Sequence, residues 1–330
     1  MQNKILKFDS ATISAAASVV GKYEQEGPFG ELFDICDPTD KFGMNTWEQA
    51  ESEMQRLAFN TALSKLSLSE RSIDALFAGD LLNQCVGSSY GLLDFDIPYF
   101  GLYGACSTAA EGIMLASACV SAGFFDRAAA VTSSHYCAAE RQYRSPIEYG
   151  SQRTPTAQWT VTGAGAFIIG NGGKVSVCEA LPGIVVEKGI SDAANMGAAM
   201  APAAADTILR YFTGSGYSPK DFDMIVTGDL GEEGGSILCE LLHAEGLDIK
   251  DVFADCGTLI YDLKTQDKHA GGSGCGCSAV VLASYLLPML ESGDLSNILL
   301  IGTGAMMSPS SIQQGLSIPA VAHLLRFSSL

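Results

Sequence analysis

An internal repeat constrains the fold of this chain more than any other feature of its sequence. Ser69–Leu81 and Ser218–Leu230 match at a constant offset of 149 residues, and both copies end in Gly-Asp-Leu. A helical pattern precedes each copy, and a short apolar strand lies within it. Solenoid repeats have periods of roughly 20–50 residues, so this one is too long to be a solenoid unit. The chain is therefore predicted to contain two duplicated α/β halves, each with a sheet covered by helices.

The two halves are expected to meet near Gly172. Apolar runs at 166–170 and 174–178 flank Asn171-Gly172-Gly173, and such a tripeptide is typical of a tight hairpin turn. We therefore divide the chain into an N-terminal half, residues 1–172, and a C-terminal half, residues 173–330.

Composition limits the class of protein and its partners. The chain has 330 residues, of which 47% are apolar and 17% charged, enough for two compact cores. Its net charge of −18 argues against nucleic acid or an anionic membrane surface as a general partner. No signal-peptide pattern is visible, and the longest apolar helix candidate, 278–290, is shorter than the roughly 20 residues that a bilayer requires. The ten cysteines are expected to be reduced thiols in an intracellular protein.

Cys106 lies in a turn of small residues. The turn joins an apolar strand, Ile97–Tyr103, to an alanine-rich helix, Ala109–Ala122. A helix N-terminus favours negative charge, so this position can lower the pKa of a thiol from about 8.5 into the range 3.5–7.5. A buried structural cysteine is the alternative, because free cysteine is among the most buried residue types. The complete strand–turn–helix pattern favours a functional site near Cys106.

Longer motifs run over most of the chain. They are Phe77–Gln84, Gly101–Thr108, Thr132–Tyr136, Ala139–Gln142, Tyr149–Gln152, Pro155–Gly165, Asn195–Asp206, Val226–Glu232 and Ala270–Val281. In these motifs the sequence resembles the thiolase-like proteins and, among them, the stage V sporulation protein AD family of spore-forming bacteria. The first forty residues match less tightly. The resemblance implies an α/β fold of two βαβαβαββ halves in a layered α/β/α/β/α architecture.

The same resemblance implies a function and a setting. Proteins of this kind bind dipicolinic acid (pyridine-2,6-dicarboxylate), as the free acid or as its calcium chelate, for uptake into the developing spore. The implied partners are other stage V sporulation uptake proteins at the forespore membrane. A homodimer is also implied, formed through the edge strand at Ile97–Tyr103. The implied location is the sporulating cell, peripheral to the inner membrane of the spore.

The residues at two turns of the second half distinguish a catalyst from a binding protein. Thiolase-like condensing enzymes place a histidine with an asparagine, or two histidines, on two turns of this half. The first matching turn, Thr227–Glu232, has no histidine, and on the second the polar position falls near Gly271, two residues from His269. We therefore expect a binding protein without catalysis. Acyl transfer or condensation with Cys106 as nucleophile is the alternative, and a structural adaptor that docks transport proteins is a third hypothesis.

A flat aromatic dianion needs forked donors, neutral hydrogen-bond groups and aromatic walls, and the segment 135–159 supplies all three. From this segment and the turns we predict nine ligand-binding residues: Cys106, His135, Arg141, Arg144, Tyr149, Gln152, Trp159, Asp229 and His269. The same set of donors, amides and aromatic side chains also includes Tyr136, Tyr143, Arg153 and Gln158. Local salt bridges of the arginines with Glu140 and Glu148 are the alternative. No cofactor or metal site is expected, because Cys275-Gly-Cys277 lacks a second pair of ligands at zinc spacing.

Overall fold

The computed structural model describes residues 4–143 and 153–330. Its strands form one mixed sheet path in the order β11-β10-β13-β14-β9-β2-β8-β6-β4-β5, with two short strands, β1 (Leu6–Lys7) and β3 (Ile35–Cys36), paired to its middle. Half of the path comes from before residue 171: β2 (Thr12–Val20), β8 (Gly163–Gly170), β6 (Ala128–Ser134), β4 (Ala75–Gly79) and β5 (Tyr99–Gly101). The other half comes from after it: β9 (Val175–Leu181), β14 (Ala320–Ser329), β13 (Asn297–Ala305), β10 (Met224–Thr227) and β11 (Phe253–Asp255).

The two sets of strands have the same topology. In each set, the first strand pairs antiparallel with the last, the last pairs antiparallel with its neighbour, and two parallel pairings complete the order. β4 and β10, the strands of the repeated motif, occupy equivalent places. The α/β class with duplicated halves is therefore confirmed. The division at Gly172 stays a prediction, since pairing of β2 with β9 joins both sets into one path.

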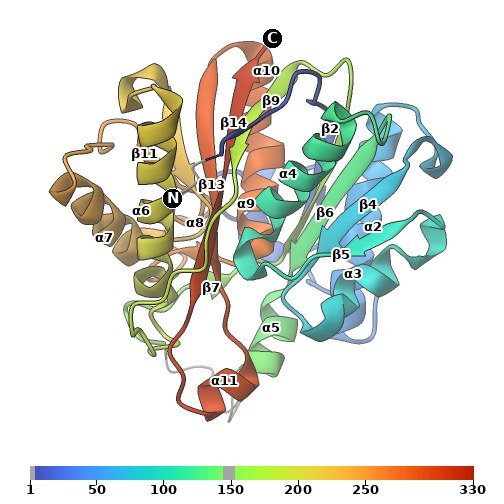
Figure 1. Cartoon of the computed structure of the whole chain (residues 1–330). Helices are drawn as coiled ribbons and strands as arrows, with labels where there is room; N and C mark the ends of the chain where they lie inside the picture. The colour runs from blue at the N-terminus through green and yellow to red at the C-terminus, as the bar shows by residue number, and fades with distance from the viewer. Residues whose placement is uncertain (1–3, 144–152) are drawn as a thin grey trace.

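The helices form three layers around the strands (Figure 1). One outer layer packs on the first set, a second outer layer packs on the second set, and a central layer contacts both sets. The outer helices are α2 (Trp47–Lys65) and α3 (Val86–Gly91) on one side, and α6 (Met196–Ser215) and α7 (Gly231–Ala244) on the other. The central helices are α4 (Thr108–Ser121) and α9 (Cys275–Val281).

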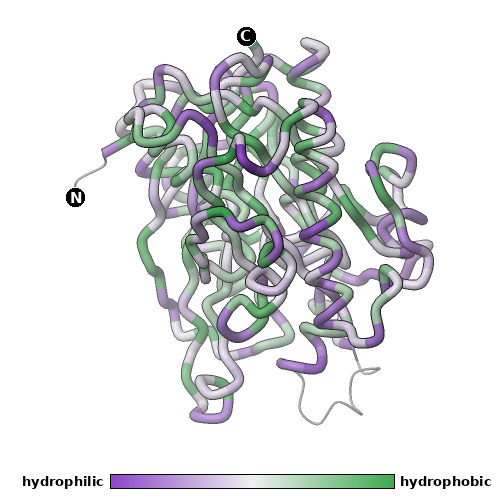
Figure 2. Tube along the Cα trace, turned by 90° about the vertical axis from the view of Figure 1, so that its right-hand side faces the viewer, coloured by the Kyte–Doolittle hydropathy of each residue, from purple (hydrophilic) through white to green (hydrophobic). Residues whose placement is uncertain are grey.

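The central layer is apolar because strands cover it from both sides. In α9 all seven residues are buried, and in α4 nine of the fourteen are. α9 continues through a π-helical turn (Leu282–Leu286) into α10 (Leu287–Ser292). The resulting stretch, Cys275–Ser292, has 18 residues and is long and apolar enough to cross a membrane, so the expectation of a shorter segment was wrong. It is 72% buried inside the molecule, as a core helix would be, and Figure 2 shows the hydrophobic segments running through the interior.

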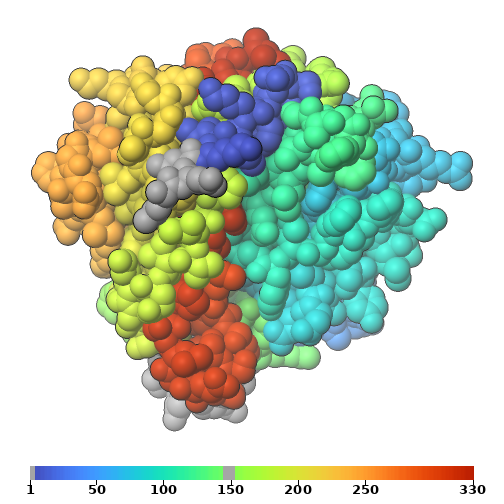
Figure 3. Space-filling model, in the orientation of Figure 1, coloured from blue at the N-terminus to red at the C-terminus, as the bar shows by residue number. Residues whose placement is uncertain are grey.

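Several loops and short elements gather at one end of the sheet. They are α5 (Tyr136–Tyr143), the two-stranded sheet of β7 (Trp159–Thr160) with β12 (Gly272–Ser273), and α8 (Cys256–Leu259). The connection from β13 to β14 carries α11 (Pro309–Gln313) and projects at the lower end of the molecule (Figure 3). A bridge between Val186 and Ala320 joins the base of this connection to the loop before α6.

Candidate functional site

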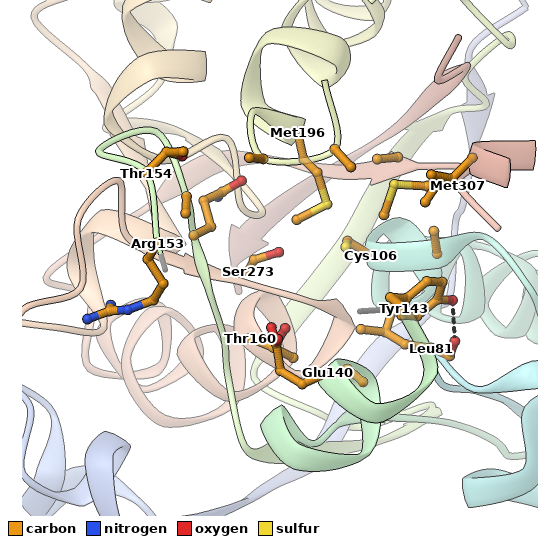
Figure 4. A pocket seen from close by; sticks show the side chains of 18 residues that line it. Leu81, Cys106, Glu140, Tyr143, Arg153, Thr154, Thr160, Met196, Ser273 and Met307 are labelled. Carbon is orange, nitrogen blue, oxygen red and sulfur yellow. Dashed lines mark hydrogen bonds between the residues drawn. The ribbon is translucent and has the colours of Figure 1, made fainter. Parts of the chain in front are cut away.

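A cavity of about 340 Å³ lies where the two central helices begin (Figure 4). Its apolar lining comes from side chains of both halves: Leu81, Met196, Met307, Ile312 and several alanines. Its polar and charged lining comes from Cys106, Glu140, Tyr143, Arg153, Thr154, Gln158, Thr160 and Ser273. This size is at the lower end of the range for small-molecule sites, roughly 300–1,000 Å³. The cavity can therefore enclose a compact ligand.

Cys106 lies at the floor of the cavity, one turn before α4. The preceding residue, Ala105, has a left-handed backbone with φ of 51°, a conformation that costs an alanine about 1–2 kcal/mol. Two hydroxyl groups hold this turn: Ser107 Oγ donates to the carbonyl of Gly104 at 2.6 Å, and Thr108 Oγ1 donates to that of Ala105 at 2.7 Å. The strained turn places Cys106 at the cavity, and a functional role for this residue stays a prediction.

Asp229 comes from the second half and lies behind the thiol. Its carboxylate accepts hydrogen bonds from Thr303 Oγ1 at 2.7 Å and from the backbone N–H of Gly274 at 2.9 Å. The Cys106 thiol also hydrogen-bonds to it. Asp229 thus caps the start of α9, whereas the equivalent Asp80 binds the N–H groups of Leu82 and Ser88 in its own half. The long-range contact between Asp229 and Cys106 joins the two halves at the site.

The prediction of a lowered thiol pKa is wrong for Cys106. Burial raises the pKa of this thiol well above its ordinary value, and the charge of Asp229 and the neighbouring Cys275 raise it further. The hydrogen bond to the Gly274 N–H acts in the opposite direction but does not offset the burial. Burial also raises the pKa of Asp229, to about 6. Near neutral pH the site therefore holds a neutral thiol that donates a hydrogen bond to a carboxylate.

Six of the predicted ligand residues lie in the described ranges, and of these only Cys106 lines the cavity; His135, Arg141, Trp159, Asp229 and His269 do not. His135 is buried behind the cavity, where Nε2 lies 2.8 Å from the carbonyl oxygen of Asp40 and Nδ1 accepts from the N–H of Cys137. Arg141 lies on the outer side of α5 and pairs with Glu48 at 3.3 Å, in a separate shallow groove. This partner belongs to α2, whereas Glu148, one of the alternatives that the sequence offered, lies outside the described residues. Neither side chain lines the space above Cys106.

Trp159 and His269 lie on the wall that separates the cavity from α1 (Lys22–Gln25). Trp159 stacks flat on Tyr136, with ring centroids 3.8 Å apart. The ring of His269 is 2.6 Å from the carbonyl oxygen of Thr154 through Nδ1 and 3.2 Å from Asp267 through Nε2. Both side chains support the wall from behind. Arg144, Tyr149 and Gln152 fall outside the described residues.

Sequence reasoning did not single out most of the residues that surround the cavity. Met196, Thr160, Ser273 and Met307 carry no local signal, because tertiary folding alone brings them together. Gln158 was grouped with the loop residues, and it joins the turn after β10 to β12: Nε2 donates to the carbonyls of Asp229 at 2.7 Å and Gly272 at 3.0 Å. Among the described residues its Oε1 has no hydrogen-bond partner, and this atom has almost no accessible surface.

Arg153 is a cation that lines the cavity. Its guanidinium donates to the carbonyl and to the carboxylate of Asp267, at 2.7 and 2.5 Å. Figure 4 shows it across the cavity from Cys106 and Tyr143. The hydroxyl of Tyr143 donates to the Leu81 carbonyl at 2.6 Å. Within the two described ranges, no three His, Cys, Asp or Glu side chains are grouped so as to hold a metal ion.

The fold and the cysteine turn define a thiolase-like protein. A crystal structure of a Xanthomonas campestris OleA variant superimposes with a TM-score of 0.61, at 16% identity, over 98% of this chain and 99% of that one. The 3-oxoacyl-(acyl carrier protein) synthase III of Xanthomonas oryzae pv. oryzae gives a TM-score of 0.58 at 15% identity, over 97% of this chain and all of that one. At such identities the likeness establishes the fold alone.

The particular family follows from the sequence itself. The profile of the stage V sporulation protein AD family matches residues 2–328. The chain is 44% identical, over 312 residues, to stage V sporulation protein AD of Bacillus subtilis (strain 168), covering 94% of this chain and 92% of the relative. The chain belongs to the stage V sporulation protein AD family, and is thus a protein of the sporulating cell.

Proposed function

We propose that this protein binds dipicolinic acid in the cavity above Cys106 and serves its uptake into the developing spore, without catalysing a reaction on it. The observation that carries the proposal is the pairing of an enclosed cavity with a protonated, hydrogen-bonded thiol at its floor. A cavity of about 340 Å³ suits a compact aromatic acid. Membership of the sporulation family supplies the biological setting.

The chemistry of the cavity supports binding over acyl transfer. None of the chain's four histidines lines it, although all four lie in the described ranges. The carboxylate bound to the Cys106 thiol is Asp229, with a pKa of about 6, and burial raises the pKa of the thiol well above its ordinary value. Proton transfer from the thiol to this carboxylate is therefore unfavourable, because each unit of pKa difference costs about 1.4 kcal/mol. A nucleophilic thiolate would therefore be scarce.

A cation lines the cavity and supports an acidic ligand. The guanidinium of Arg153 is bound to Asp267, so a carboxylate of the ligand would have to displace that partner. A guanidinium would then offer two parallel hydrogen bonds, a geometry that lysine does not match. Gln158 Oε1 has almost no accessible surface and does not face the open space of the cavity. Apolar side chains such as Met196 and Met307 would contact the ring.

The test is calorimetric titration with dipicolinic acid, with and without calcium. We expect saturable binding that weakens at least about tenfold in Arg153→Ala, because a charge-assisted hydrogen bond is worth about 1.5–3 kcal/mol. Arg141→Ala is the matched control, since that arginine lies in the outer groove. Thermal unfolding of each variant shows that it is folded. Absence of saturable binding both with and without calcium would refute the proposal. Loss of binding in Arg141→Ala alone would place the ligand in the groove beside α5.

We also propose that the protein is a homodimer and works with other stage V sporulation proteins at the forespore membrane. The exposed edge strand β5 supports the dimer. Its residues Tyr99 and Phe100 are 38% and 49% exposed, and Tyr103 just beyond it is 51% exposed. An apolar sheet edge of this kind is usually covered in a native protein. The membrane partners rest on the family resemblance alone.

A further inference from the structure

A lysine is buried behind the wall of the cavity. Lys268 is 2% exposed, and its ammonium nitrogen lies 3.4 Å from the ring centroid of Trp159, 3.8 Å from that of Tyr23 and 5.3 Å from that of Tyr261. Within residues 4–143 and 153–330 the ammonium has no salt bridge within 4.0 Å. Cation–π contacts are worth about 2 kcal/mol or more when the cation is desolvated. Three aromatic rings therefore replace much of the hydration that this ammonium lost.

A buried carboxyl group faces the same cluster. Glu24 of α1 is 1% exposed, and its Oε1 accepts from the Thr162 N–H at 3.0 Å and from the hydroxyl of Tyr261. Its Oε2 is buried and has no hydrogen-bond partner in the described part of the chain. The attraction of Glu24 acts on Lys268 and opposes the effect of burial. The ammonium, the rings and the carboxyl form one cluster that joins α1 to the segment around Lys268.

This cluster stands directly behind residues that line the cavity. Trp159 belongs to β7, and Lys268 lies in the turn just before β12, the strand that pairs with β7. The N–H of Trp159 donates to the Gly271 carbonyl, and that of Val161 to the Ser273 carbonyl, both at 2.8 Å. Thr160 and Ser273, on these same strands, face the cavity. Whatever fixes Trp159 against α1 therefore fixes the wall that a ligand would touch.

We propose that Lys268 is a positioning residue whose positive charge clamps the β7–β12 wall to the aromatic rings and Glu24 of α1. Loss of that charge loosens the wall and weakens ligand binding. The part that concerns the ligand rests on the function proposed above, and the part that concerns the wall does not.

The charged groups around the ammonium shift the pKa of Lys268. They are Glu24 and Glu26 at α1, Asp267 and Arg153 beside the wall, with Asp40 next to Glu24 and the phenols of Tyr23 and Tyr261. The pKa of Lys268 is lowered to about 8: burial is the largest cause and Arg153 acts in the same direction, while Glu24, Asp267 and Glu26 oppose them. The pKa of Glu24 is raised to about 7 by burial, so Glu24 is ionised when Lys268 titrates. The wall should therefore be clamped below about pH 8 and loosened above it.

Fluorescence of Trp159 tests the clamp without any ligand. The chain has two tryptophans, so Trp47→Phe leaves Trp159 as the reporter. We expect its emission to change in a step with a midpoint near pH 8. Lys268→Arg should abolish the step, since arginine stays charged, and Glu24→Gln should shift it to lower pH. Lys264→Met, an exposed lysine of the same loop, is the matched control and should leave it unchanged. A parent without the step, or the same step in Lys268→Met, would overturn the proposal.

Hydrogen exchange and affinity complete the test. At pH 7 the amides of Trp159 and Val161 should exchange at least about threefold faster in Lys268→Met than in Lys264→Met, and equal rates would overturn the clamp.

Dipicolinate binding should weaken about tenfold from pH 7 to pH 9 in the parent and not in Lys268→Arg. Equal weakening in both would refute the link to the ligand. If the parent binds no dipicolinate at any pH, the proposed function fails, while the Trp159 step still decides the clamp.

Discussion

At the scale of single residues, the environment of Cys106 outweighs its position on the helix. A helix N-terminus stabilises a thiolate by its unpaired N–H groups, and here the Gly274 N–H also points at the sulfur. Full burial and the carboxylate of Asp229 act in the other direction and prevail. The same turn geometry that activates a cysteine in a polar site therefore leaves this one protonated.

This protonation state predicts slow alkylation. At pH 7.5 iodoacetamide should modify Cys106 at least about a hundredfold more slowly than a free thiol, because the thiolate fraction falls tenfold for each unit of pKa. Asp229→Asn should speed the reaction, since it removes the negative charge that raises the thiol pKa. Mass spectrometry of the Cys106 peptide measures the rate, with the half-buried Cys178 as internal reference. A Cys106 that reacts faster than Cys178 would favour the enzymatic alternative.

At the scale of elements, β5 is the strand most open to a second chain. It ends the sheet path, and in the described part of the chain no strand pairs with its outer edge. Phe100 stacks on Phe77 with a centroid distance of 5.0 Å, so one face of the strand is anchored while the edge stays available. In the homodimer proposed above, the two subunits would meet at this edge.

A charge on this edge should prevent pairing. We expect Phe100→Lys to shift the protein from dimer to monomer in sedimentation velocity at micromolar concentration, because charged side chains block edge-to-edge contact. Phe124→Lys is the matched control: that phenylalanine is 76% exposed and lies in the turn after α4, away from β5. Equal sedimentation of the parent and both variants would contradict pairing through β5.

At the scale of the whole molecule, buried carboxyl groups dominate the electrostatics of the interior. Burial raises the pKa of Glu24 to about 7 and that of Asp229 to about 6, and it raises those of Glu51, Asp80 and Asp255 as well. In the unfolded chain these groups titrate near pH 4. At these carboxyl groups folding thus takes up protons between about pH 4 and pH 7. His323 acts in the opposite sense, because burial lowers its pKa to about 4.

The sign of this uptake predicts a more stable protein in mild acid. Where the folded state binds more protons than the unfolded state, the free energy of unfolding falls as pH rises. The free energy of unfolding, and with it the urea midpoint, should therefore be higher at pH 5.5 than at pH 8. Glu24 and Asp229 should each contribute a difference on the order of 1–3 kcal/mol to this free energy. Asp229→Asn should flatten the dependence. A midpoint that rises with pH over this range would contradict the raised pKa values.

The repeat and the cysteine turn could be predicted from sequence because both depend on local patterns. Strand, turn and helix around Cys106 follow from neighbouring residues, and the 149-residue offset places β4 and β10 in equivalent positions. The site's electrostatics could not be predicted in this way. The carboxylate of Asp229 reaches Cys106 only after the halves pack together, and the direction of Arg141 toward Glu48 depends on the rotation of α5. Three predicted ligand residues lie outside the described ranges.

The pairing of β2 with β9 limits how a ligand can enter. Thr12 and Ile13 lie in register with Ser176 and Val175, and Thr12 Oγ1 accepts from the Gly173 N–H at 2.9 Å while donating to the Gly170 carbonyl at 2.7 Å. These contacts tie the chain between the halves into the sheet. The β2–β9 pairing therefore opposes a hinge motion of one half relative to the other. The cavity is lined by Met307 and Ile312 of the connection bearing α11 and by Ala193 and Ala194 of the loop before α6, and a bridge joins the two segments. A ligand of the proposed kind would therefore meet the side chains of two loops held by one frame, and these side chains would set which molecules can enter.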